Sequence, residues 1–259
     1  MIKKRLFVHI PYKQLMENLA KIEGEDFNIE ICLSGDMLDN YPAKDIDRLL
    51  KFLKERDKDC TFHAPYQDLN PGSLDREIRK ITLRRFHQTL ELASEFKPLI
   101  IVFHTGFDPW RYSDLEDEWL RLSLKTWEEV LRRAEGISAK LALENVFESK
   151  PQQILRIIKE FSPPLGFCFD VGHYNVFSHL PLKSWFEILH KFLLELHLHD
   201  NNGQLDEHLG LGQGCFPFDE LLSLLKLFPS SALLTIEGCD EAAIRASLRY
   251  IKEYFLIDY

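Results

Sequence analysis

Four apolar segments of the sequence each carry a carboxylate or an imidazole at their ends. They are LALEN, GFCFDV, ELHLHD and LLTIEG, and the side chains concerned are Glu144, Asp170, His197 and Glu237. Carboxylates and imidazoles together suit zinc, manganese or iron, whereas magnesium and calcium prefer oxygen ligands alone. These residue types therefore point to a metal site and to metal-assisted chemistry.

Further side chains of the same kinds follow the same pattern along the chain, and they are His63, His104, His173, Asp206 and His208. A lone histidine of this kind is more often a hydrogen-bonded core residue than a metal ligand. Buried charges cost several kcal/mol each unless they are paired or bound to cations. A purely structural role is therefore harder to accept for Glu144, Asp170, His197 and Glu237 taken together. We predict a metal site made by the four, and the other five as additional ligands or as residues that orient ligands.

The elements that carry these residues alternate regularly. Eight short segments rich in β-branched and aromatic residues predict strands, and longer amphipathic segments between most of them predict helices. Eight successive strand–helix units favour one closed (β/α)8 TIM barrel, because a doubly wound sheet would place a glycine-rich phosphate loop after the first strand. The predicted strands are residues 5–10, 27–33, 60–64, 99–104, 140–145, 166–171, 195–200 and 233–238, and the predicted helices are 45–56, 76–96, 116–136, 152–161, 182–192, 218–228 and 240–255.

Alternation within a strand predicts which side chains point into the barrel. Successive residues of a strand face opposite sides, so Leu141 and Leu143 face the helices while Ala142 and Glu144 face the barrel axis. The same rule turns Asp170, His197 and Glu237 of the later strands toward the barrel axis. Because TIM-barrel enzymes build their active sites at the carboxyl ends of the strands, we predict the metal site at that mouth.

Composition narrows the class of protein. The chain of 259 residues has no linker or composition break, so we predict one domain over residues 1–259. A net charge of −9 disfavours, without excluding, nucleic acid as a partner. No apolar run approaches the roughly 18 residues that cross a bilayer. Five scattered cysteines without a CxxC pair predict reduced thiols and a cytoplasmic protein. No interface signature indicates the oligomeric state.

Other features suggest substrate contacts. Arg111 is the best-placed cation for a phosphate or carboxylate, although a surface salt bridge is the commoner role. Aromatic residues after strands, Tyr66 and Trp110 among them, either wall a sugar pocket or close the barrel top. The segment LGLGQG lacks the Lys-Ser/Thr ending of a phosphate loop, so we predict a turn that lets the backbone approach the site.

The ordered endings HAPY, VFHTG, ALEN, FDVGH, HLHD and TIEG resemble the xylose isomerase-like TIM-barrel superfamily, from about Phe62 to Gly238. That superfamily contains sugar isomerases and epimerases together with the endonuclease IV repair nucleases. The segment HDNNGQLDEHLGLGQG is especially similar to its bacterial sugar phosphate isomerase/epimerase members.

In the epimerase branch, the resemblance implies one divalent metal, zinc or manganese, held by Glu144, Asp170, His197 and Glu237. The two glutamates are then the catalytic acid and base, and His173 positions a substrate oxygen. His208 is a further substrate-binding candidate, as are Tyr66, Trp110 and Arg111.

In the nuclease branch, the resemblance implies three zinc ions and uses all nine donors. His63, His104 and Glu144 hold the first, with Glu144 shared by the set of four, and His173, Asp206 and His208 hold the third. Tyr66 matches a position that the nucleases use near DNA. Two features weaken this branch. The acidic net charge is unfavourable because DNA binding depends on neutralising phosphates. The loops after the first two strands are short, which leaves little chain to insert into a duplex.

We therefore expect a divalent-metal-dependent isomerase or epimerase acting on a small sugar, sugar phosphate or related polyol. The alternative is an endonuclease IV-like zinc phosphodiesterase acting on abasic-site DNA. A third reading is a sugar-binding protein on a catalytically degenerate barrel, which intact ligands disfavour.

Overall fold

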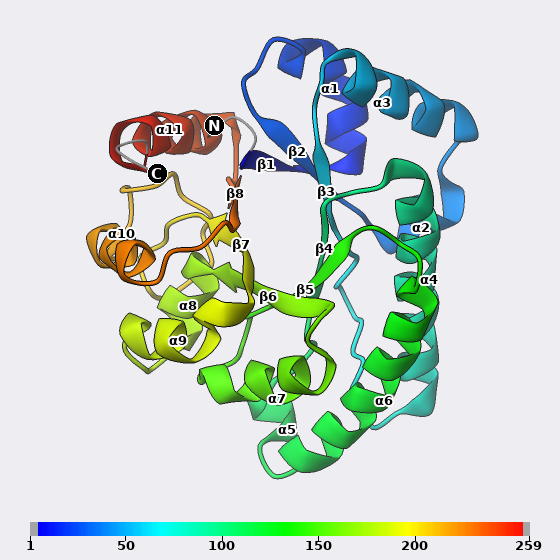
Figure 1. Ribbon diagram of the computed structural model, residues 1–259, viewed down its shortest axis with the longest axis vertical. Helices are drawn as coiled ribbons and strands as arrows, with labels where there is room; N and C mark the ends of the chain where they lie inside the picture. Colours follow the sequence, from blue (N-terminus) through cyan, green and yellow to red (C-terminus); the bar gives the residue numbers. More distant parts are fainter. Residues whose placement is uncertain (1–4, 256–259) are drawn as a thin grey trace. The chain divides into compact units, whose positions relative to one another are not determined.

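Eight parallel strands form a closed barrel in the order β1 to β8 in the computed structural model, which describes residues 5–255 (Figure 1). This confirms the predicted (β/α)8 fold. Every predicted strand is present, with ends shifted by at most two residues. The strands are β1 (Leu6–Pro11), β2 (Asn28–Cys32), β3 (Cys60–His63), β4 (Ile100–His104), β5 (Lys140–Glu144), β6 (Leu165–Asp170), β7 (Leu193–Leu198) and β8 (Leu233–Ile236).

Helices follow the strands, and four of them (α1, α2, α5 and α8) were not predicted individually. The last three are short, and α8 runs through the glycine and histidine of VGHYNVF. The helices are α1 (Tyr12–Ile22), α2 (Gly35–Asn40), α3 (Ala43–Glu55), α4 (Arg76–Phe96), α5 (Pro109–Tyr112), α6 (Glu116–Ala134), α7 (Pro151–Phe161), α8 (Val171–Phe177), α9 (Leu182–Leu189), η2 (His190–Phe192), α10 (Phe218–Leu227), α11 (Glu241–Tyr250) and η3 (Ile251–Phe255).

The chain divides into two compact units, which are described separately below. The N-terminal unit comprises residues 9–142, and the C-terminal unit comprises residues 1–8 and 143–259. The expectation of one domain over residues 1–259 stays a prediction, and residues 1–4 and 256–259 lie outside the described part of the chain. No helix within residues 5–255 is long and apolar enough to cross a membrane.

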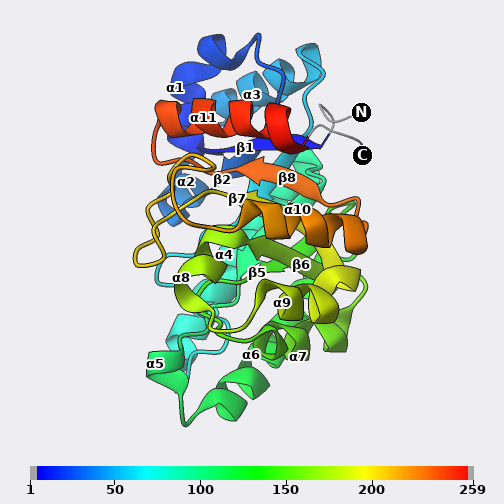
Figure 2. The ribbon, with the colours of Figure 1, turned by 90° about the vertical axis from the view of Figure 1, so that its left-hand side faces the viewer.

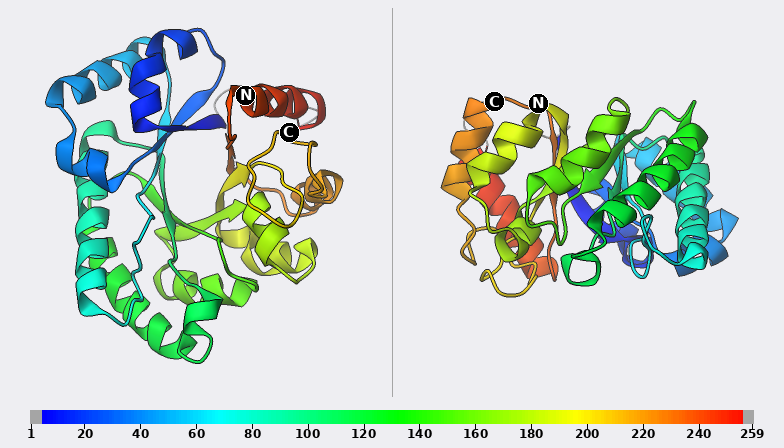
Figure 3. Two further views of the ribbon diagram at one scale, coloured as in Figure 1. Left: turned by 180° about the vertical axis from the view of Figure 1, so that it is seen from behind. Right: turned by 90° about the horizontal axis from the view of Figure 1, so that it is seen from below.

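The N-terminal unit holds β2, β3 and β4 in parallel register. Cys32 pairs with His63 at the ends of β2 and β3, and His63 pairs with Val102 of β4. Outside the strands, α4 and α6 run side by side (Figures 1 and 3). Phe86 and Trp127 from these two helices stack at 5.5 Å, so a buried aromatic layer fixes the helices over the strands.

The C-terminal unit holds β6, β7 and β8, with the first residues of β1 beside β8. Asp170 pairs with His197, and His197 pairs with Thr235, so the predicted donors come from neighbouring strands. Phe169 packs against Trp185 of α9, on the opposite side of β6 from Asp170. Helices α9, α10 and α11 cover this side of the strands (Figure 2). The predicted alternation of inward polar and outward apolar residues is therefore confirmed for β6.

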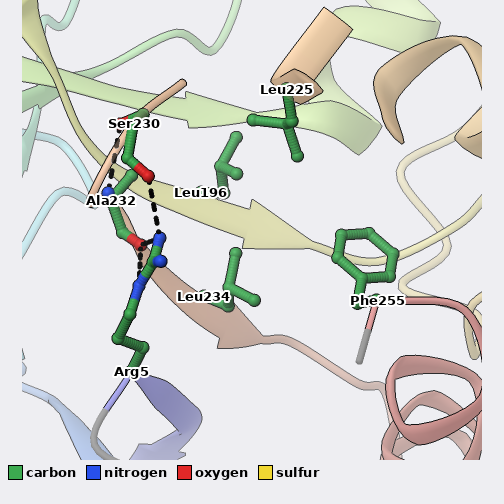
Figure 4. Close-up of a pocket in the computed structure, with 7 residues that line it drawn as sticks. All are labelled: Arg5, Leu196, Leu225, Ser230, Ala232, Leu234 and Phe255. Carbon is green, nitrogen blue, oxygen red and sulfur yellow. Dashed lines mark hydrogen bonds between the residues drawn. The ribbon is translucent and has the colours of Figure 1, made fainter. Parts of the chain in front are cut away.

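The outward face of β7 and β8 is shown in Figure 4. Leu196 and Leu234 project toward Leu225 of α10 around a small cavity of about 30 Å³. Arg5 closes one end, where its Nε donates to the carbonyl oxygen of Ala232 at 3.0 Å. The apolar lining and the size of this cavity identify it as packing space between strands and helices.

Candidate metal centre

Four predicted ligands of the C-terminal unit lie together. The Nδ1 of His197 is 3.3 Å from Oε1 of Glu237, 3.5 Å from Oε1 of Glu144 and 4.0 Å from Oδ2 of Asp170. All four side chains are buried, and none is more than 7% exposed. Glu144 and Asp170 end β5 and β6, His197 lies near the end of β7, and Glu237 directly follows β8.

This donor set fits a divalent cation. Three buried carboxylates around one imidazole repel one another, and burial makes each charge expensive. A cation bound among Glu144, Asp170, His197 and Glu237 would offset both costs. Three oxygens and one nitrogen match the preferences of zinc and manganese.

Asn145 joins the ends of β5 and β6 and was missed by sequence reasoning. Its Nδ2 donates to the carbonyl oxygen of Asp170 at 2.9 Å, and its Oδ1 accepts from the backbone N–H of Asp170 at 2.9 Å. This reciprocal pair fixes Asp170 beside Glu144. The only sequence signal for this role was that Asn145 directly follows the predicted ligand Glu144 in ALEN.

His199 orients the carboxylate of Asp170. Its Nε2 lies 3.1 Å from both carboxylate oxygens, and its ring is fully buried. Gly172 leaves the space for this ring, because a Cβ there would lie 2.0 Å from Cε1 of His199. The glycine of FDVGH therefore permits the orienting contact, as is usual for residues behind metal ligands.

The segment after β7 returns over the same donors. His208 has φ 51°, a left-handed conformation that costs a non-glycine residue about 1–3 kcal/mol. Its ring stacks on His199 at 3.9 Å and 2°, and its Nδ1 lies 3.4 Å from Oε2 of Glu237. Its Nε2 is 3.1 Å from Oδ2 of Asp206. Contacts with His199, Glu237 and Asp206 thus stabilise the strained backbone conformation of His208.

His173 links the returning segment to the first donors. Its Nδ1 lies 3.0 Å from the carbonyl oxygen of Asn145 and 3.1 Å from Oε1 of Glu144, and its Nε2 lies 3.2 Å from Oδ2 of Asp206. A second donor cluster results, with ligand atoms within 4.8 Å of one another, made by His173, His199, Asp206 and His208. His199 is the member that the predicted ligand set lacked.

Opposite charges within this second cluster stabilise one another and shift the pKa values of its members. Burial lowers the pKa of His173, but the carboxylates of Asp170, Asp206 and Glu144 outweigh it and hold that pKa well above its usual range. Burial likewise opposes ionisation of Asp206, yet hydrogen bonds from His173 and His208 hold its pKa well below the usual range. Without metal, the cluster therefore favours an ionised Asp206 between protonated imidazoles.

This charge arrangement predicts a pH dependence for the metal-free protein. A raised pKa at His173 adds stability that is complete below its ordinary value of 6.5 and is lost as pH rises through the folded pKa. The lowered pKa of Asp206 adds stability that is complete above its ordinary value of 3.8 and is lost in stronger acid. In chelator, the free energy of unfolding measured with urea should be lower at pH 9 than at pH 6. His173→Gln should flatten that alkaline decline, and an unchanged decline would contradict the assignment.

Asp200, another residue that sequence reasoning missed, organises LGLGQG. Its Oδ2 accepts from the backbone N–H groups of Gly212 at 3.0 Å and Gly214 at 2.9 Å. Its Oδ1 accepts from those of Asn201 at 2.9 Å and Phe216 at 3.1 Å. The segment is the predicted turn, and its N–H groups bind a carboxylate of the protein itself.

Asp200→Asn should destabilise the protein. The amide keeps one acceptor oxygen but turns a donor toward the N–H groups of Gly212 and Gly214, leaving these part-buried groups without that acceptor. We expect a loss of about 2–4 kcal/mol in the free energy of unfolding, measured with urea. Asp219→Asn on the exposed start of α10 is the control. A loss below about 0.5 kcal/mol at Asp200, the range of ordinary surface changes, would show that the carboxylate is dispensable.

Three predicted residues gather in the N-terminal unit. His63 and His104 end β3 and β4 with their rings 5.0 Å apart, and Tyr66 stacks on His104 at 4.3 Å. Sequence reasoning missed the pair beside them, in which Nδ1 of the half-buried His9 lies 2.9 Å from Oε1 of the fully buried Glu30. The alternation rule would have turned Glu30 inward with the other donors.

Trp110 and Arg111 lie on the short helix α5. Arg111 is 69% exposed and its Nε lies 3.7 Å from Oδ2 of Asp108, so it forms the commoner surface pair. Trp110 is 74% exposed. Their proposed contacts with a substrate stay predictions.

The chain belongs to the xylose isomerase-like TIM barrel family, whose model matches residues 17–254. The uncharacterized protein MJ1311 of Methanocaldococcus jannaschii is 32% identical over 256 residues, covering 95% of this chain and 86% of that protein. A crystal structure of a D-tagatose 3-epimerase-like protein is 29% identical with a TM-score of 0.83, and 97% of each chain is covered.

Two further solved structures extend the comparison. The TTHB071 protein from Thermus thermophilus, soaked with ZnCl2, is 26% identical with a TM-score of 0.79, covering 96% of this chain and 97% of that chain. Endonuclease IV from the same organism is 16% identical with a TM-score of 0.71, covering 96% of this chain and 99% of that chain. The likeness to endonuclease IV concerns the fold alone.

Proposed function

We propose that the protein is a divalent-metal-dependent isomerase or epimerase acting on a small sugar, sugar phosphate or related polyol. The observation that carries this proposal is the placement of Glu144 and Glu237, which approach the same nitrogen of His197 at 3.5 and 3.3 Å. Two buried carboxylates beside one metal position are what proton removal and return next to a carbonyl require.

Glu144, Asp170, His197 and Glu237 would hold the metal, which we take to be one zinc or manganese ion. When bound, it would polarise the substrate carbonyl and stabilise the negative charge that develops beside it. The low exposure of these four side chains excludes water and strengthens such electrostatic effects.

Each proposed acid/base glutamate has its own imidazole partner. His173 Nδ1 lies 3.1 Å from Oε1 of Glu144, and His208 Nδ1 lies 3.4 Å from Oε2 of Glu237. A protonated imidazole at this distance orients the carboxylate and stabilises its negative charge. One glutamate removes the proton next to the carbonyl, and the same or the other glutamate returns it.

The comparisons support this class of reaction through the epimerase-like structure at 29% identity, and the ZnCl2-soaked structure supports a divalent metal. We place the protein in the cytoplasm, because all five cysteines are free thiols. The ligand is then a small molecule, and the net charge of −9 makes nucleic acid a poor partner.

A zinc phosphodiesterase is the second candidate. The cluster of His173, His199, Asp206 and His208 favours it, since these donors exceed what one metal needs. We favour the isomerase because two of these donors, His173 and His208, are engaged in ion pairs with Glu144 and Glu237, the residues that would move the proton.

The proposal is tested by solvent exchange. The protein, loaded with Mn²⁺ or Zn²⁺, is incubated in D2O with a panel of ketoses, aldoses and their phosphates, and deuterium is located by NMR. We expect metal-dependent incorporation at the carbon next to the carbonyl of at least one sugar. Absence of exchange with the whole panel, together with nicking of abasic duplex DNA, would establish the second candidate instead.

A further inference from the structure

Glu195 is a buried carboxylate of the C-terminal unit that the proposed reaction does not use. It belongs to β7 and is fully buried. Taking a carboxylate out of water costs several kcal/mol unless other groups compensate for the lost hydration. Its place beside the candidate metal centre gives this charge a role.

Alternation along β7 places Glu195 behind His197. The two residues are two positions apart, so their side chains leave the same face of the strand, and Glu195 lies further from the carboxyl end. A carboxylate oxygen of Glu195 and a ring nitrogen of His197 lie within 4.8 Å of each other. The proposed ligands Glu144, Asp170 and Glu237, in contrast, all follow or end strands and surround Nδ1 of His197.

Neighbouring strands hold Glu195 in place. Thr235 of β8 pairs with His197 in register, and its Oγ1 donates to Oε1 of Glu195. Cys168 of β6 pairs with Glu195 itself. Thr235 and Cys168 are both fully buried. The carboxylate therefore has a fixed position in a layer of side chains directly behind the proposed ligands.

The tautomer of His197 decides whether its ring can bind a cation. A neutral imidazole has one N–H group and one nitrogen with a lone pair, and only the second coordinates a metal. Because Nδ1 of His197 is the nitrogen that the three carboxylates surround, the proton must lie on Nε2 when an ion binds there. Such an N–H group is usually held by a carboxylate, a backbone carbonyl or water.

Two side chains of the C-terminal unit are candidates to hold this proton. Cys168 lies close enough to His197 to interact with its ring, but the sulfur of a thiol is a weak acceptor. Glu195 offers carboxylate oxygens, and hydrogen bonds to an ionised acceptor are roughly twice as strong as those between neutral groups. The comparison favours Glu195.

We propose that Glu195 is a positioning residue of the metal centre, which holds His197 as the tautomer with its proton on Nε2 and so leaves Nδ1 to the divalent ion. This inference rests on the metal centre of the proposed function. It gives a role to a carboxylate that neither binds the ion nor moves the proton of the substrate. Thr235 supports this role by fixing one oxygen of Glu195.

Spectroscopy of the histidine rings tests the tautomer directly. Long-range ¹H–¹⁵N correlation spectra of the zinc-loaded protein show which nitrogen of each imidazole carries a proton. We expect the proton of His197 on Nε2, and a proton on Nδ1 would overturn the proposal. The measurement uses the unchanged protein, so it does not depend on the folding of a variant.

Glu195→Gln should weaken zinc binding by about 10–100-fold, the usual cost of replacing a residue behind a metal ligand. Affinity is measured by competition with a chromophoric chelator. The free energy of unfolding of the metal-free protein is measured with urea in parallel, so that a loosened fold is separated from a lost positioning contact. Glu187→Gln on the exposed side of α9 is the matched control. Equal zinc affinity in the Glu195→Gln and Glu187→Gln proteins would overturn the role.

Two neighbouring variants separate Glu195 from the competing thiol. Thr235→Val removes the hydroxyl that fixes Oε1 of Glu195, so it should weaken zinc binding in the same direction by a smaller factor. Cys168→Ala should weaken zinc binding less than Glu195→Gln does. A larger loss in Cys168→Ala than in Glu195→Gln would assign the role to the thiol and overturn the proposal.

The two proposals fail separately. If zinc binding depends on Glu195 but no sugar exchanges a carbon-bound proton, the isomerase proposal fails and the role of Glu195 stands. If a sugar exchanges its proton and Glu195→Gln leaves zinc affinity unchanged, the isomerase proposal stands and the role of Glu195 fails.

Discussion

Glu237→Gln is expected to lower the rate of exchange of the substrate's carbon-bound proton with solvent by about 10²–10⁴-fold. The amide keeps the size of the side chain that follows β8 but cannot take up a proton. Its neighbour His208, at 3.4 Å, would remain to hold the substrate. The rate is measured by NMR in D2O on metal-loaded protein. Metal content is measured in parallel, so that loss of the ion is separated from loss of the base.

The same result is expected for Glu144→Gln, because Glu144 meets His173 as Glu237 meets His208. Glu187→Gln provides the control: it removes an exposed carboxylate of α9 that pairs with Lys183 at 3.6 Å. Full exchange in either Glu144→Gln or Glu237→Gln protein would refute the role proposed for that residue.

Asp170→Asn and His197→Ala are each expected to weaken divalent-metal binding by at least 100-fold. Replacing residues behind metal ligands costs about 10–100-fold, and these two are proposed as direct ligands. Asp170 also anchors His199, so its loss disturbs both donor clusters. Affinity is measured by competition with a chromophoric chelator. The thermal midpoint should no longer rise when metal is added to either variant.

His208→Ala separates the two metal arrangements. With one ion per chain, this variant should keep its metal stoichiometry, and His208 then belongs to the substrate. Loss of bound zinc in His208→Ala alone, with the other ions retained, would assign His208 to a further ion.

The fold and the first donors were predictable because both follow from local alternation. Strands of alternating polarity turned Asp170 inward and Phe169 outward, and the structure confirms both placements. The same rule brought Glu144, His197 and Glu237 together, since neighbouring parallel strands end at one edge. Eight such strands closed a barrel as expected.

The supporting residues were not predictable, because their roles depend on contacts far apart in sequence. Asn145 reaches 25 residues along the chain to Asp170, and His199 reaches Asp170 across 29 residues. The sequence around Asp200 does not indicate that its carboxylate accepts hydrogen bonds from four backbone N–H groups.

Element-resolved metal quantification on protein purified without chelator tests the central claim most directly. An isomerase whose ion is held by Glu144, Asp170, His197 and Glu237 should carry close to one divalent ion per chain. A value close to three zinc ions per chain would contradict the one-metal site and favour the phosphodiesterase.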